Sequence, residues 1–138
     1  MTVLDTSAAI DYLIGADVAK QVTGILASEG EVAAPDLIVL EVLAALRRET
    51  LRGFLAEERA TGALNDLADL SIELFPCLPL RKRAWELREN FTAADALFVA
   101  LAEQLDEPLA TKDGPLAAAA RKHTSLVVNL LGTDPPPP

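Results

Sequence analysis

The stretch Thr92-Ala93-Ala94-Asp95-Ala96-Leu97-Phe98-Val99-Ala100-Leu101-Ala102 is apolar or small on every side from Ala93 onward, with one exception. A helix that is hydrophobic all round is a buried helix, so this segment predicts a helix at the centre of the fold. The exception is Asp95, in the first turn of that helix. A buried carboxylate costs several kcal/mol unless a cation, a hydrogen-bond donor or protonation relieves it. The rest of the chain must therefore supply the group that offsets the cost of burying the Asp95 carboxylate.

The spacing Thr92-x-x-Asp95 also matches a capping box, which is the simpler explanation of the acid. In a capping box the acid bonds back to the cap residue and faces the positive end of the helix. Asp95 would then only stabilise the start of the helix. Further carboxylates at the same place are needed to favour a functional role.

Short apolar runs alternate with helical patterns along the whole chain. We expect strands at Thr2–Leu4, Glu31–Ala34, Ile72–Phe75, Pro108–Thr111 and Leu126–Val128. We expect helices at Ala8–Ile14, Asp17–Ser28, Leu37–Leu51, Phe54–Ala68, Leu80–Glu89, Ala93–Leu105 and Leu116–Lys122. This alternation predicts an α/β fold of three layers (α/β/α), with a central, mainly parallel, five-stranded sheet and helices on both faces. Residues 1–132 are expected to form one domain, and the proline-rich segment 133–138 a mobile tail.

Three further acids are expected at the same edge of the sheet as Asp95. Asp5 directly follows the first strand and Asp113 lies just beyond the fourth, while Glu41 interrupts the aliphatic helix after the second strand. That helix is expected to bury a face consisting of Leu37, Leu40, Leu43, Ala44 and Leu51. Sites in open α/β sheets form at the carboxyl ends of the strands, so the four acids converge.

Four neighbouring carboxylates cannot all stay ionised without a counter-charge, and hard divalent cations such as Mg²⁺ or Mn²⁺ prefer oxygen ligands. Cys77 and His123 are each the only residue of their kind, which excludes the usual zinc sites. An oxygen-only cluster suits metal-assisted attack of water on a phosphodiester. The acids thus favour a metal-dependent nuclease.

Other chemistries match the sequence less well. A glycine-rich phosphate loop with Lys and Ser/Thr is missing, and no serine, histidine and acid combination stands out. A carboxylate pair for glycoside hydrolysis is conceivable, but with 4% aromatic residues the chain offers little to stack sugars. A receiver-like signalling domain would need a second acid after the first strand, where Ser7 stands, and an acceptor Asp after the third, where Pro76-Cys77 stands.

Composition limits the partners and the location of the protein. The formal net charge of −9 argues against general affinity for nucleic acid, but the cations gather in short groups. From these groups we take Arg47, Arg48, Arg81 and Arg83 as candidates for RNA contact. Hydrophobic residues make up 51% of the chain, more than one core can hide, which indicates an interface with a second copy or another protein. The early Asp5 excludes a signal peptide, and no apolar run could span a membrane, so we expect a cytoplasmic protein.

The sequence resembles the PIN-domain family and, within it, the VapC-type toxins of bacterial toxin–antitoxin pairs. The resemblance rests on four blocks in order: Val3-Leu4-Asp5-Thr6-Ser7-Ala8, Glu41 in its aliphatic helix, Thr92 to Ala102, and Leu109-Ala110-Thr111-Lys112-Asp113. It covers nearly the whole chain apart from the proline tail. Ala94 departs from the family pattern, which often has an aromatic residue before the acid, but this change does not touch the acids.

The resemblance implies an endoribonuclease that depends on Mg²⁺ or Mn²⁺, with Asp5, Glu41, Asp95 and Asp113 as catalytic and metal-binding acids. Thr6 and Thr111 would orient ligands or water. It further implies a homodimer that a small, VapB-like antitoxin holds inactive by laying a helix in an apolar groove. The alternative is a non-catalytic PIN-like binding module that acts only through a protein partner, which would need at least one acid displaced from the cluster.

Overall fold

A computed structural model describes residues 1–132, and the segment 133–138, predicted to be a mobile tail, lies outside the described residues. The strands are β1 (Val3–Leu4), β2 (Val32–Pro35), β3 (Ile72–Phe75), β4 (Leu109–Thr111) and β5 (Val128–Leu130). The helices are α1 (Thr6–Ile14), α2 (Ala19–Glu29), α3 (Ile38–Leu51), α4 (Glu57–Asp69), α5 (Arg81–Glu86), α6 (Ala93–Leu105) and α7 (Gly114–His123). A 3-10 turn at Leu78–Leu80 precedes α5.

The strands form one sheet in the order β3-β2-β1-β4-β5, and all four pairings are parallel. The sheet is thus wholly rather than mainly parallel within residues 1–132. The central strand β1 aligns Val3 with Ala33 of β2 on one side and with Leu109 of β4 on the other. All five strands end at the same edge, which confirms the predicted fold class and gives Asp5 and Asp113 a common location.

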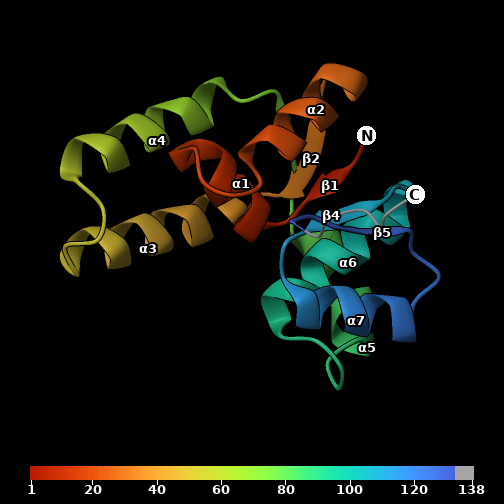
Figure 1. The fold of residues 1–138 in the computed structure, drawn as a ribbon. Coiled ribbons are helices and arrows are strands. Elements are labelled where there is room, and N and C mark those ends of the chain that lie inside the picture. Colours follow the sequence, from red (N-terminus) through yellow and green to blue (C-terminus); the bar gives the residue numbers. More distant parts are fainter. Residues whose placement is uncertain (133–138) are drawn as a thin grey trace.

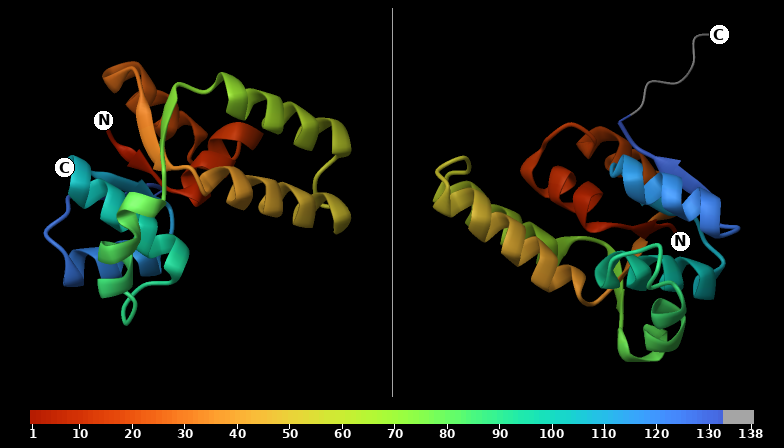
Figure 2. Two further views of the ribbon diagram at one scale, coloured as in Figure 1. Left: turned by 180° about the vertical axis from the view of Figure 1, so that it is seen from behind. Right: turned by 90° about the horizontal axis from the view of Figure 1, so that it is seen from below.

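The helices lie in two layers, one on each face of the sheet. Right-handed crossovers between parallel strands place α1 to α4 on one face and α5 to α7 on the other. Figure 1 shows α5, α6 and α7 below the strands and α3 and α4 to their left, and both views of Figure 2 show α3 and α4 extending beyond the sheet as a pair. No helix within residues 1–132 has the length and apolar character that crossing a membrane requires.

Helix α6 is the buried helix that the opening stretch predicts. It packs against β1, β2 and β4, and the side chains from Phe98 to Ala102 are all almost inaccessible to solvent. Its first turn differs, because Ala93 is exposed and Asp95 is only half-buried. The acid therefore lies where the helix emerges from the core, and its burial is less complete than the sequence suggests.

The buried face of α3 differs from the predicted one. Ile38, Val42, Ala45 and Leu46 point into the core, whereas Leu40, Leu43 and Leu51 are exposed, Leu40 by 67%. Aliphatic side chains project from most sides of this helix, so the sequence pattern is compatible with more than one buried face. Packing against α1 and α4, which the pattern does not contain, selects the face that is buried.

Several boundaries also differ from the expected ones, three of them with consequences for exposed or connecting residues. Helix α4 begins at Glu57, which leaves Phe54 exposed in a turn, and the expected helix over 80–89 is shorter, ending at Glu86. Strand β5 begins two residues late, at Val128, because residues 125–127 are needed to return from the end of α7 to the sheet. None of these shifts moves one of the four acids.

An ion pair joins α1 to the segment that follows β4, at the edge of the sheet where the strands end. Asp11 of α1 is only 4% exposed, and the ammonium group of Lys112, just after β4, lies 2.9 and 2.8 Å from its two carboxylate oxygens. The backbone N–H of Val18 also donates to this carboxylate, at 3.4 Å. Because a lone buried charge is costly, this contact ties α1 to the segment that includes Thr111 and Asp113.

Replacing Lys112 by Met keeps the length of the side chain and leaves the Asp11 carboxylate without its cation. We expect Lys112→Met to lower the free energy of unfolding by about 2 kcal/mol, less than in a dry interior because Lys112 is partly exposed. Urea denaturation measures this. Lys122→Met on the exposed surface of α7 is the matched control, and equal denaturation midpoints for the two variants would contradict the prediction.

Candidate active site

Asp5 lies at the centre of the site, directly after β1, and is only 6% exposed. It caps the N-terminus of α1: its Oδ1 accepts hydrogen bonds from the hydroxyl of Ser7 (2.8 Å) and the N–H of Ala8 (3.2 Å). Its Oδ2 accepts a hydrogen bond from the hydroxyl of Thr111, at 2.7 Å. Three donors thus fix the carboxylate, because a short polar residue follows β1 closely and another ends β4.

Thr111 and Asp113 form the second part of the site, at the end of β4. The Thr111 hydroxyl, fully buried, accepts a hydrogen bond from the N–H of Asp113 at 2.9 Å while it donates to Asp5. Asp113 caps α7 by accepting from the N–H of Leu116 at 3.0 Å. Thr111 therefore connects two of the predicted acids through a single hydroxyl group.

Glu41 and Asp95 complete the acidic set from the two faces of the sheet. Glu41, in the first turn of α3, accepts a hydrogen bond from the hydroxyl of Thr6. Asp95, in the first turn of α6, donates its backbone N–H to the hydroxyl of Thr92 at 3.2 Å. This is one of the two bonds of the predicted capping box, so Asp95 belongs to a helix cap and also faces the pocket described next.

A single pocket of about 350 Å³ is lined by all four acids together with Thr6, Ser7, Ile10, Ala44, Ala45, Arg48 and Phe98. None of the four acids forms an ion pair within residues 1–132. They surround the pocket without meeting at one point, and in the part of the chain that the structure describes no group of three ligand-type side chains is arranged to hold a metal ion. Mutual repulsion and the separate hydrogen bonds of each acid account for this spread.

The pocket is unfavourable for negative charge. Burial raises the pKa of Asp5, an effect that the bonds from Thr111, Ser7 and Ala8 partly offset and that the Asp95 charge increases. Burial also raises the pKa of Asp95, with further increases from the charges of Asp113 and Glu41. A cation in the pocket would relieve both effects, and an all-oxygen donor set is the kind that Mg²⁺ and Mn²⁺ take. The residues therefore fit such an ion, provided that the side chains turn inward.

The four basic candidates lie in different surroundings. Arg48 lines the acidic pocket, whereas its neighbour Arg47 lines an apolar groove between α3 and α4. Arg83 forms a two-bond ion pair with Glu103, at 2.9 and 3.1 Å, and a further pair with Glu86. Arg81 has no ion pair within residues 1–132. Of the four, Arg48 is thus the one beside the acids.

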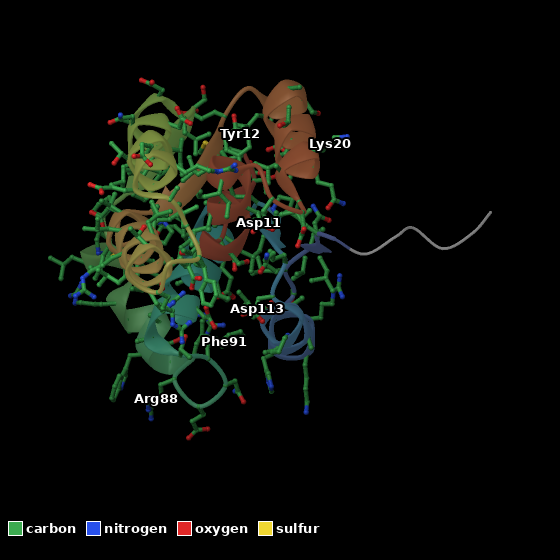
Figure 3. All side chains as sticks on the ribbon, turned by 60° about the vertical axis from the view of Figure 1, so that its left-hand side comes forward. Asp11, Tyr12, Lys20, Arg88, Phe91 and Asp113 are labelled. Atoms are coloured by element: carbon green, nitrogen blue, oxygen red, sulfur yellow. The ribbon has the colours of Figure 1, made fainter. Side chains whose placement is uncertain are left out.

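Three residues that the sequence analysis did not select also hold the site together. Ser7 bonds to Asp5 and accepts a hydrogen bond from the N–H of Lys112 at 3.3 Å, while Lys112 pairs with Asp11. In the view of Figure 3, Asp113 lies below Asp11. A signal for Asp11 exists in the sequence, because it is an acid within an otherwise apolar helix, as Asp95 is.

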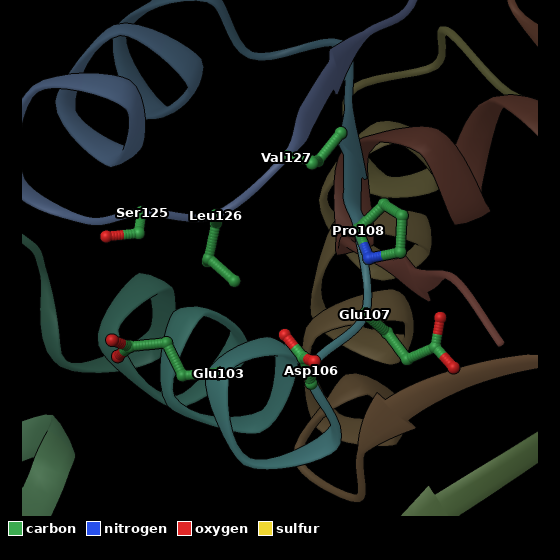
Figure 4. A pocket seen from close by; sticks show the side chains of 7 residues that line it. All are labelled: Glu103, Asp106, Glu107, Pro108, Ser125, Leu126 and Val127. Carbon is green, nitrogen blue, oxygen red and sulfur yellow. The ribbon is translucent and has the colours of Figure 1, made fainter.

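A second pocket, of about 410 Å³, lies at the opposite edge of the sheet and also contains acids (Figure 4). Two of these acids are already paired. Glu103 binds the guanidinium of Arg83, and Glu107 binds the N-terminal amine of Met1 at 2.8 Å. Its neutralised charges contrast with the unpaired acids of the first pocket, which is the better candidate for a functional site.

The chain belongs to the PIN-domain family, whose family model, described as PIN domain, matches residues 2–122. It is similar over most of its length to three VapC ribonucleases of Mycobacterium tuberculosis (strain ATCC 25618 / H37Rv). Ribonuclease VapC1 is 43% identical over 118 residues, which are 85% of this chain and 89% of the relative. Ribonuclease VapC12 is 36% identical over 85% of this chain and 90% of the relative, and Ribonuclease VapC9 34% identical over 93% and 98%. Within the family the chain is therefore of the VapC type.

Two solved structures share the fold. PAE2754 from Pyrobaculum aerophilum has a TM-score of 0.70 and 22% identity, covering 94% of this chain and 83% of that one. VapBC2 from Rickettsia felis, bound to a DNA fragment from their promoter, has a TM-score of 0.69 and 14% identity, covering 94% and 98%. At these identities they support the fold alone, which agrees with the family assignment.

The raised pKa of Asp95 predicts how pH affects stability. Between the ordinary value of 3.8 and the higher folded-state pKa, the folded protein binds more protons at Asp95 than the unfolded chain does. The free energy of unfolding of the wild type, measured relative to Asp95→Asn, should therefore fall as pH rises through this window and then level off. Urea denaturation in EDTA at a series of pH values tests this, and a relative stability that rises with pH would refute it.

Proposed function

We propose that the protein is an endoribonuclease toxin, active in the cytoplasm, that hydrolyses RNA phosphodiester bonds with Mg²⁺ or Mn²⁺ as cofactor. The observation that supports this most directly is the single pocket that Asp5, Glu41, Asp95 and Asp113 all line, none of them in an ion pair within residues 1–132. The ribonuclease relatives of the VapC type support the same substrate class. A metal ion held there would polarise the phosphate and lower the pKa of a bound water molecule.

The residues of the chain have distinct roles in this proposal. Asp5 and Asp95 are the main metal ligands, and Asp113 and Glu41 complete the set. Thr111 holds Asp5 and the backbone of Asp113 in fixed positions through its hydroxyl, and Thr6 does the same for Glu41. These hydroxyl bonds are in place before RNA arrives, and binding of the ion would require the carboxylates to turn inward from them.

Arg48 is the side chain that we propose for contact with the RNA backbone. It lines the acidic pocket from α3, and its only ion pair within residues 1–132 is a surface contact of 3.3 Å with the adjacent Glu49. Exposed pairs of this kind contribute little, so the guanidinium can turn to a phosphate. A cation at the rim also offsets the repulsion between RNA and the acids.

Two partner proteins are proposed for the apolar surface. A groove of about 170 Å³ between α3 and α4, lined by Leu43, Leu46, Leu51 and Leu64 among others, suits the apolar side of a helix from a VapB-like antitoxin. A second copy of the chain would cover Val39 and Leu40 on α3, which are exposed. In these assignments the exposed leucines of α3, which do not pack in the core, contact partner proteins.

A non-catalytic PIN-like binding module is the alternative function. It would need at least one acid away from the pocket, and all four line it. The arrangement therefore favours catalysis over a purely structural role, although both proposals share the fold and the partners.

Removing the charge of Asp95 tests the catalytic proposal. We expect Asp95→Asn to reduce Mn²⁺-dependent cleavage of structured RNA by at least about a thousandfold while the circular dichroism spectrum stays unchanged, since a principal ligand is lost. Asp106→Asn is the matched control. It lies at the other end of α6, and asparagine tolerates its left-handed backbone. Cleavage by Asp95→Asn at the rate of the control would exclude the assignment.

Variants of two neighbouring arginines of α3 distinguish a direct contact between Arg48 and the RNA backbone from a general effect of positive charge. Arg48→Gln should lower kcat/KM for RNA by about tenfold, the effect of one charge-assisted hydrogen bond, because Arg48 lines the acidic pocket. Arg47→Gln removes the same charge from the groove side and should change kcat/KM little in the absence of antitoxin. Equal losses for the two variants would argue against a specific role for Arg48.

A further inference from the structure

Trp85 is the only tryptophan of the chain, and 68% of its surface is exposed. It lies on α5, which follows the edge strand β3 and packs against α6. A large aromatic side chain at such exposure loses the stabilisation that burial would give it. Its position therefore suggests a ligand with an apolar, flat surface.

The charge around Trp85 indicates what that ligand is. The guanidinium of Arg88 lies over the indole ring, 4.6 Å from its centroid, in a cation–π contact. Arg88, Arg81 and Lys82 form no ion pair within residues 1–132, in contrast to Arg83 between them. In a protein with a net charge of −9, this surface combines an aromatic face with unpaired cations. Bases and phosphates of single-stranded RNA match both features.

A pocket of about 300 Å³ adjoins the indole ring and is lined by Arg81, Ala84, Trp85, Arg88, Phe91 and Ala93. Ala93 is the first residue of α6, and Asp95 lies in the same turn. Figure 3 shows Asp113, Phe91 and Arg88 in that order along one side of the molecule. The pocket thus lies at the N-terminal end of α6, the same end of the helix that carries Asp95, although it shares no lining residue with the acidic pocket.

We propose that Trp85, Arg81 and Arg88 form a stacking site for an unpaired base of the RNA substrate. The base would stack on the face of the indole ring away from Arg88, and the two guanidinium groups would contact the adjacent phosphates. The site selects unpaired RNA, because a base within a helix is already stacked on its neighbours. This proposal rests on the proposed ribonuclease function and specifies its substrate.

Fluorescence of the single tryptophan tests the site directly. With Asp95→Asn in EDTA, so that RNA stays intact, a short oligoadenylate should quench the emission of Trp85 in a saturable way. An abasic oligomer of equal length should bind about tenfold more weakly and leave the emission unchanged, since it lacks the stacking interaction. Absence of quenching, or equal affinity of the two oligomers, would overturn the proposal.

Matched variants test the contribution of each side chain to affinity. Trp85→Leu should weaken binding of the oligoadenylate by about tenfold but leave the affinity for the abasic oligomer unchanged. Arg88→Gln should weaken binding of both oligomers and reduce the salt dependence of that binding. Equal binding of the oligoadenylate by wild type and Trp85→Leu would also overturn the proposal.

The same samples distinguish failure of the stacking site from failure of the proposed nuclease function. They also test whether a second copy of the chain, and not RNA, covers Trp85. If the wild type cleaves RNA with Mn²⁺ but the emission of Trp85 does not change when RNA binds, the stacking site is wrong and the nuclease function stands. Quenching without any cleavage contradicts the nuclease alone. Emission that shifts with protein concentration in the absence of RNA, and is insensitive to RNA, would mean that a second copy covers Trp85, and would overturn the stacking site.

Discussion

The hydrogen bond from the Thr111 hydroxyl to Asp5 is the contact on which the rest of the site depends. It connects residues 106 positions apart, and it forms because β1 and β4 are parallel neighbours that end side by side. The same hydroxyl accepts the N–H of Asp113, and Asp5 in turn begins α1. One buried threonine thus sets the position of two acids and two helices, and the strand pairing that places it excludes water from the contact.

Much of this arrangement follows from the sequence. The alternation of short apolar runs and helices predicts the parallel sheet, and the rule that sites form at the carboxyl ends of strands places Asp5, Glu41, Asp95 and Asp113 at one edge. The all-apolar pattern after Asp95 predicts the buried part of α6. These features are local, or depend on the order of elements alone, and a single sequence contains that information.

Other features depend on packing that no local pattern records. The pairing of Asp11 with Lys112 joins distant segments, so the sequence pattern can mark Asp11 as an unusual acid but does not show its partner. Helix α3 is aliphatic on several sides, and its neighbours decide that Leu40 faces solvent. The different surroundings of Arg47 and Arg48 arise because one residue step turns the side chain by about 100° around a helix. Only the packing partners show which of two adjacent arginines faces the acids.

The order of the strands has a consequence for how the protein is made. The central strand β1 is synthesised early, but one of its two neighbours, β4, leaves the ribosome more than a hundred residues later, and the chain between them must wait for that pairing. Contacts between such distant segments form late in folding. The nascent chain therefore carries Asp5 and Glu41 without an acidic pocket until β4 has been made and has paired with β1.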